Sequence, residues 1–186
     1  INIYFDEKGE ELEELIKHAN DAGIFTSIST NAQALTKERA KKIVLSGLGK
    51  IIISMDGTTQ EVYEQYRKGG NLQKAIDGIN YLNYWKRELK IKSPFIELQF
   101  IVFKTNEHQM RDIKKLAKQL KVDKLTYKSA QIYDFEQGEQ LLTSINKYAR
   151  YKLTTTNTFV IKNKLKNRCW RQWSGGVVNA KGELLP

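Results

Sequence analysis

Residues 50–57, with the sequence KIIISMDG, decide the fold. The isoleucines form an unbroken apolar run, which is typical of a strand that is buried on both faces in a parallel sheet. The small polar residues Ser54, Asp56 and Gly57 mark the point where this strand ends. Similar runs rich in apolar and β-branched residues predict further strands at 1–5, 24–30, 95–103 and 124–130.

Amphipathic segments separate these strands. Apolar residues at helical spacing predict helices at 10–23, 36–47, 58–67, 72–89 and 106–120. Thr58 and Glu61 have the spacing of a capping box, and Asn106 and Gln109 open the last helix. Because strand and helix alternate along the chain, we expect right-handed crossovers and a parallel sheet, in an α/β fold that is either doubly wound or a barrel.

The alternation stops near residue 133. We therefore expect an α/β domain at 1–133, a basic linker at 134–168 and a short β-hairpin appendage at 169–186. In a parallel α/β fold, ligands bind at the carboxyl ends of the strands, where this sequence places small polar residues. The sequence thus predicts that polar residues gather at the carboxyl ends of the strands, next to an apolar core.

Charge and cysteine content narrow the classes of protein. The net charge is +10, and between Lys147 and Arg171 the chain carries eight basic residues and no acidic one. This run is either a solvated face or a surface for nucleic acid or an acidic partner.

The single cysteine, Cys169, excludes an internal disulfide and a four-cysteine metal site, and a reducing cytoplasm is the expected location. No apolar stretch is long enough for a membrane helix, so we expect no membrane partner.

Three stretches, IFTSISTN (24–31), KIIISMDGTTQEVYEQYRKGGN (50–71) and FIELQFIVFKTNEHQ (95–109), resemble radical S-adenosylmethionine (radical SAM) enzymes with a C-terminal SPASM extension. The resemblance implies an incomplete (βα)6 partial TIM barrel. It also implies S-adenosylmethionine and [4Fe-4S] clusters as cofactors in the parent enzyme. Such enzymes cleave S-adenosylmethionine reductively to a 5'-deoxyadenosyl radical, which takes a hydrogen atom from a substrate that is commonly a peptide or protein.

The resemblance implies several cofactor-binding residues. Thr30 and Asn31 would face the S-adenosylmethionine pocket, although the same pair also fits a simple strand-to-helix turn. Ser54 and Asp56 belong to a motif of the form SxDG, in which the hydroxyl can hydrogen-bond the ribose or the methionine carboxylate. Asp56 followed by glycine is also an ordinary turn signal.

Arg67 matches an arginine that the family sets against the methionine carboxylate, for which its planar fork is suited. Gln99 lies on the same side of its strand as Glu97, and that side is either the barrel interior or an outer face. Lys128 and Gln131, at the end of the last strand, are the candidates for a general acid or base.

The chain also departs from the family pattern. It has no CxxxCxxC loop, and residues 1–5 align best with the second barrel strand, so we expect the second to sixth βα units and no cofactor bound by the chain itself. The chain is then either a fragment of an ordinary enzyme or a degenerate member that keeps the scaffold as a binding module. A barrel without its first strand leaves an exposed edge, which predicts self-association.

The final residues fit the start of a SPASM extension. Twelve residues separate Cys169 from Gly182, and four more follow it, which matches the spacing that precedes the family's second cysteine. The resemblance therefore implies that Cys169 ligates an auxiliary iron-sulfur cluster in the parent.

Overall fold

A four-stranded parallel sheet forms the centre of the molecule. The computed structural model describes residues 12–132, 141–155, 158–162, 175–179 and 183–185. The strands lie in the order β1-β2-β3-β4, and all three pairings are parallel. Their bounds are β1 Ser27–Thr30, β2 Lys50–Ser54, β3 Phe95–Val102 and β4 Lys124–Ser129. Four of the five predicted strands are thus confirmed, and the one predicted at 1–5 lies outside the described residues.

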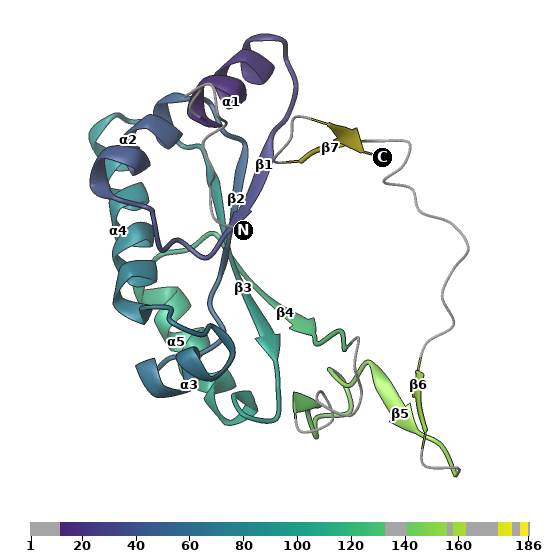
Figure 1. Ribbon diagram of the computed structural model, residues 1–186. Helices are drawn as coiled ribbons and strands as arrows, with labels where there is room; N and C mark the ends of the chain where they lie inside the picture. The colour runs from purple at the N-terminus through teal and green to yellow at the C-terminus, as the bar shows by residue number, and fades with distance from the viewer. Residues whose placement is uncertain (1–11, 133–140, 156–157, 163–174, 180–182, 186) are drawn as a thin grey trace.

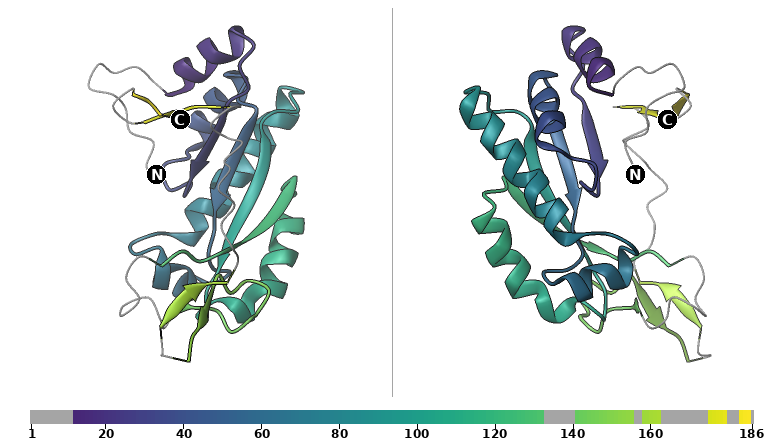
Figure 2. Two further views of the ribbon diagram at one scale, coloured as in Figure 1. Left: turned by 90° about the vertical axis from the view of Figure 1, so that its right-hand side faces the viewer. Right: turned by 60° about the vertical axis from the view of Figure 1, so that its left-hand side comes forward.

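Helices connect the strands and cover one face of this sheet (Figure 1). The two views of Figure 2 show the same layering, with helices on one side of the strands. The helices and a short 3₁₀ helix are α1 Leu12–Asp21, α2 Lys37–Leu45, α3 Gln60–Tyr66, α4 Leu72–Glu88, η1 Glu107–Gln109 and α5 Met110–Gln119. No helix among the described residues has the length and apolar character needed to cross a bilayer.

The strand order separates the two architectures that the sequence left open. Consecutive strands are neighbours, and right-handed crossovers made in one direction place every helix on the same face. A doubly wound sheet would carry helices on both faces. The described sheet is therefore an open segment of an α/β barrel.

The core lies between the sheet and the helices. Ile51 and Ile53 of β2, with Ile96, Leu98 and Phe100 of β3, are fully buried. Because side chains alternate along a strand, the residues between them point to the face that the helices do not cover. That face, here called the open face, carries Lys50, Ile52, Ser54, Glu97, Gln99 and Thr126.

Two helix starts differ from the sequence pattern. The N-cap of α3 is Thr59, whose side chain accepts from the N–H of Val62, so the predicted capping box at Thr58 is wrong by one residue. The backbone N–H of Thr58 instead donates to Gln109 Oε1 at 2.7 Å. The side chain of Asn106 makes no cap for the helix that follows, because its Oδ1 accepts from the N–H of Phe103.

The region predicted as a basic linker contains secondary structure. Leu141 and Leu142 join the end of β3 through a hydrogen bond from the N–H of Lys104 and a bridge to Phe103. The carboxylate of Glu107 accepts from the hydroxyl of Thr143 and from the N–H of Ser144, so this segment is held at η1.

Two short antiparallel pairs follow. They are β5 Tyr151–Leu153 with β6 Phe159–Ile161, and β7 Val177–Val178 with β8 Leu184–Leu185. Cys169 lies outside the described residues.

Candidate functional site

The carboxyl end of the open face carries a row of neutral polar side chains. In the register of the sheet, Ser54 pairs with Gln99, and Gln99 pairs with Thr126. Ser54 is 7% exposed, and no described residue hydrogen-bonds its hydroxyl or the side-chain amide of Gln99. The structure thus brings these two predicted residues side by side on one face, with their hydrogen-bonding groups available to a ligand.

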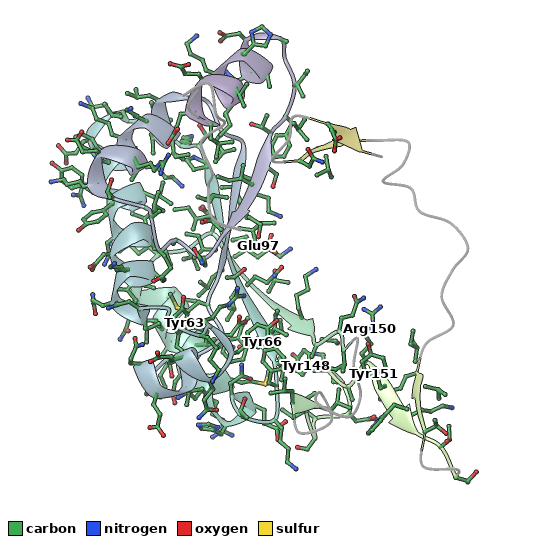
Figure 3. The ribbon with its side chains drawn as sticks, in the orientation of Figure 1. Tyr63, Tyr66, Glu97, Tyr148, Arg150 and Tyr151 are labelled. Atoms are coloured by element: carbon green, nitrogen blue, oxygen red, sulfur yellow. The ribbon has the colours of Figure 1, made fainter. Side chains whose placement is uncertain are left out.

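An ion pair between Lys50 and Glu97 lies in the middle of the open face. Lys50 Nζ lies 2.5 Å from Glu97 Oε2, and Figure 3 shows Glu97 at the centre of the sheet. Burial raises the pKa of Glu97, but Lys50, Thr126 and the charge of Lys124 outweigh burial and hold this pKa below its ordinary value. Glu97 is therefore a buried carboxylate that stays ionised, and the alternation of the strand was the signal that located it.

Asp56 and Arg67 form a second, more deeply buried pair. Arg67 Nε donates to Asp56 Oδ2 at 2.7 Å, and Arg67 Nη2 lies 2.6 Å from the same oxygen. The other oxygen, Oδ1, accepts from the N–H of Ile101 at 2.7 Å. Burial raises the pKa of Asp56, while Arg67 and the Ile101 N–H favour its charged form. Since both carboxylate oxygens are occupied by groups of the protein, the geometry gives Asp56 a structural role.

Asn106 links the ends of β2 and β3. Its Nδ2 donates to the carbonyl of Asp56 at 3.0 Å and to the carbonyl of Ile101 at 2.9 Å. Gly57 is needed beside this link, because a Cβ there would lie 2.4 Å from the backbone nitrogen of Tyr63. The SxDG segment is thus fixed by α3 on one side and by Asn106 on the other.

Thr30 and Asn31 make the turn that follows β1. Thr30 Oγ1 accepts from the N–H of Ala32, and Asn31 Oδ1 accepts from the N–H of Gln33. Thr30 is buried and pairs with the core residue Ile53, so its position in the register is on the helix-covered face. These bonds give both residues the turn role that was the alternative expectation, and their contact with a cofactor stays a prediction.

Gln33 extends the site beyond the residues that the sequence indicated. Its side chain donates to Tyr63 Oη and to the carbonyl of Asn71, and accepts from the N–H of Asn71. Gln33 therefore joins the turn after β1 to the segments around α3 and α4. A single glutamine in a turn has no sequence signal for this role.

The end of β4 carries the remaining candidates. Lys128 and Gln131 are exposed, and Lys128 has no ion-pair partner among the described residues. Figure 3 shows Arg150 beyond the end of β4, on the side away from the helices. The buried Nε of Arg150 has no hydrogen-bond partner in the described part of the chain. Arg150 thus holds a buried donor without a partner in that part of the chain, and the sequence indicated this residue only as one member of a basic run.

The two implied cofactors fit this site differently. Ser54 and Gln99 offer the hydroxyl and amide that a polar ligand such as S-adenosylmethionine would use. The described residues contain no group of three or more His, Cys, Asp or Glu that could hold a metal ion, and the sequence has one cysteine. These residues therefore do not provide the three thiolates of a catalytic [4Fe-4S] cluster.

Comparison with known proteins agrees with the fold. A family model described as the radical SAM superfamily matches residues 3–117. A PqqA peptide cyclase of Bradyrhizobium diazoefficiens is 29% identical over 125 residues, covering 67% of this chain and 31% of that protein. An AdoMet-dependent heme synthase of Nitratidesulfovibrio vulgaris is 30% identical over 108 residues, or 58% of this chain and 28% of that protein.

Among solved structures, SuiB of Streptococcus suis bound to S-adenosylmethionine superposes with a TM-score of 0.56 at 16% identity. The match covers 72% of this chain and 29% of that one. SuiB bound to its precursor peptide SuiA gives a TM-score of 0.54 at 16% identity, over 70% and 27% of the two chains. The chain spans about three tenths of the length of these proteins. Since the family model matches more than half of its residues, the chain belongs to the radical SAM superfamily.

Proposed function

We propose that this chain is part of a radical SAM enzyme that modifies a peptide, and that its open face forms one wall of the S-adenosylmethionine and substrate site. The single observation that carries the proposal is the Ser54–Gln99 pair at the carboxyl end of the open face. Residues at that end of an α/β barrel contact ligands, whereas residues at the amino end serve stability.

Each side chain of the site has a proposed role. Ser54 and Gln99 would hydrogen-bond S-adenosylmethionine, which supplies the radical precursor when bound. Asp56 would hold Arg67 and the end of β3 in place, and Arg67 would present its remaining N–H groups toward the methionine carboxylate. Thr30 and Asn31 would shape the turn beside the cofactor.

The names of two similar proteins support a peptide as the substrate. One relative is a PqqA peptide cyclase, and one structural neighbour was solved with a precursor peptide. The open face, which the helices do not cover, is compatible with a peptide lying along the strand ends. No general acid or base is assigned to the chain.

The proposal includes a SPASM extension. Its support is the spacing from Cys169 to Gly182, together with the antiparallel pairing of β7 with β8 on either side of residues 180–182. In the complete enzyme Cys169 would then ligate an auxiliary iron-sulfur cluster.

The experiment is a comparison of single variants in the complete protein that contains these residues. Ser54→Ala and Gln99→Ala should each weaken binding of S-adenosylmethionine about threefold to tenfold, the range expected for one lost hydrogen bond. Ser27→Ala is the matched control, because Ser27 lies at the amino end of β1 and is exposed. Isothermal titration calorimetry gives the affinities, and liquid chromatography follows the formation of 5'-deoxyadenosine.

Two results would contradict the proposal. One is equal affinity in all three variants and the parent, which would remove the site from the open face. The other is a complete protein without any CxxxCxxC loop, which would favour a binding module. In that case, binding to single-stranded nucleic acid that weakens steeply as salt rises would identify the basic run as the functional surface.

A further inference from the structure

A groove on the outer surface of the helical layer lies apart from the site on the open face. It has a volume of about 400 Å³ and lies where α4 meets the start of α2 and the end of α5. Its lining includes Lys37, Asn80, Tyr84, Arg87, Gln119 and Lys121. Three of these side chains are cationic, and none of the described residues that line the groove is acidic.

Hydrogen bonds between helices hold the groove in shape. Trp85 Nε1 donates to the carbonyl of Lys37 at 2.7 Å, which ties α4 to the start of α2. Asn83 Nδ2 donates to the carbonyl of Leu120 at 2.7 Å, which ties α4 to the end of α5. A ligand therefore meets walls that are already positioned, which lowers the entropy lost on binding.

Lys37 stands in a position that helix stability does not explain. It is the first residue of α2, after the N-cap Thr36, where the helix dipole disfavours a cation. Its Nζ lies 4.4 Å from the centre of the Tyr84 ring, so the side chain is directed over the groove wall. Arg87 approaches the same ring at 5.7 Å.

The cations of the groove are weakly neutralised by the protein. Arg87 pairs with Glu88 at 3.6 Å, but the two side chains are 72% and 46% exposed, and such pairs contribute little. Lys37 and Lys121 have no ion-pair partner in the part of the chain that the structure describes. The groove thus has positive charge to offer an anionic ligand.

We infer that this groove binds an acidic peptide segment of a partner protein through carboxylates that contact Lys37, Arg87 and Lys121. The favourable term is charge complementarity, aided by the neutral amides of Asn80 and Gln119 as hydrogen-bond donors. A nucleic acid fits less well, because single-stranded binding relies on open aromatic faces and Lys37 already lies over Tyr84. The inference does not depend on the function proposed for the open face.

The test uses the full chain and fluorescein-labelled hexaglutamate, with binding followed by fluorescence anisotropy at about 150 mM salt, where long-range attraction is largely screened. The variant Lys37→Gln/Arg87→Gln should bind the peptide about tenfold more weakly, since each exposed pair contributes up to about fivefold. The control Lys74→Gln/Lys114→Gln removes the same charge from exposed positions of α4 and α5 that do not line the groove, and should stay within about twofold of the parent. Circular dichroism checks that both double variants keep their helices.

Three outcomes would overturn the inference. The first is that the parent chain fails to bind hexaglutamate under these conditions. The second is that the groove variant and the control variant lose the same affinity, which would show that the peptide is attracted by net charge alone. The third is that a single-stranded hexanucleotide displaces the peptide, and that the groove substitutions lower the affinity for the hexanucleotide more than the affinity for the peptide. The groove would then be a nucleic-acid site.

Discussion

Replacement of Asp56 by asparagine should destabilise the chain strongly, because the carboxylate is used at both oxygens. Oδ1 accepts from the N–H of Ile101, and Oδ2 accepts from Arg67. Asparagine has one acceptor oxygen, so in either orientation its NH2 group faces a donor. The side chain of Arg67 is 22% exposed and that of Asp56 is fully buried, so the loss leaves a largely buried cation without its partner.

The magnitude follows from these contacts. Breaking a buried ion pair by removing one partner costs about 3 to 5 kcal/mol, and we expect about 3 kcal/mol here because Arg67 keeps some contact with water. For a chain of this size that loss lowers the melting temperature by about 6 to 12 °C. Urea unfolding followed by circular dichroism gives the free energy of unfolding.

The control for this prediction is Asp112→Asn. Asp112 pairs with Lys115 at 3.1 Å and lies in the first turn of α5, but the side chains of Lys115 and Asp112 are 75% and 56% exposed, so loss of the charge should cost no more than about 1 kcal/mol. The double variant Asp56→Asn/Arg67→Leu should recover part of the loss, because it removes the buried cation as well. If the Asp56→Asn variant is as stable as the Asp112→Asn variant, the reasoning is refuted. Arg67 would then not be paired with Asp56 in solution.

Three further changes test other parts of the fold. The pKa of Glu107 is lowered because its hydrogen bonds to the segment after residue 140 outweigh the effect of burial, so its stabilisation is present above about pH 4.5 and is lost as the pH falls. Glu107→Gln should therefore be less stable than the parent at pH 7, and the difference in urea unfolding should shrink below pH 4.5; a constant difference would contradict this. Gly57→Ala should lose more than about 2 kcal/mol, because the new Cβ meets the backbone of Tyr63, whereas Gly69→Ala meets no atom within 4 Å and should lose about 1 kcal/mol for its φ of 68°. Phe25 is 74% exposed and lies next to β1, an outer strand of the sheet that the described residues form, so Phe25→Ser should reduce the expected self-association; sedimentation that finds the parent a compact monomer would rule the association out.

The strands and helices were predictable because their signals are local. The isoleucine run at 50–54 became a central strand, and the helix predicted at 72–89 was found at Leu72–Glu88. The choice between a barrel and a doubly wound sheet was not predictable from these signals, because it depends on which face each helix covers. The error at Thr58 has a similar cause, since the group that claims its N–H, Gln109, lies far along the chain.

The sequence indicated which candidate residues would lie close together, but their contact with a cofactor stays a prediction. The end of the isoleucine-rich strand indicated Ser54 and Asp56, and the alternation of side chains along the next strand indicated Gln99, which pairs with Ser54 in the sheet. The hydrogen bonds of Asn106 to two strand ends join residues far apart in sequence, and no local pattern predicts them. The groove at α4 needs three helices to assemble, so it was also beyond the reach of the sequence.

The hydrogen bonds of Asp56 to Arg67 and Ile101 change how the aspartate of an SxDG motif is interpreted. The aspartate joins Arg67, at the end of α3, to Ile101 of the central strand β3, and the glycine makes room for that helix. Their contribution to stability is enough to explain both residues, without any contact to a cofactor. Ser54 and Gln99 have no hydrogen-bond partner for their side chains among the described residues. If they contact S-adenosylmethionine as proposed above, these two residues, rather than Asp56 and Gly57, would indicate whether a related sequence binds the cofactor.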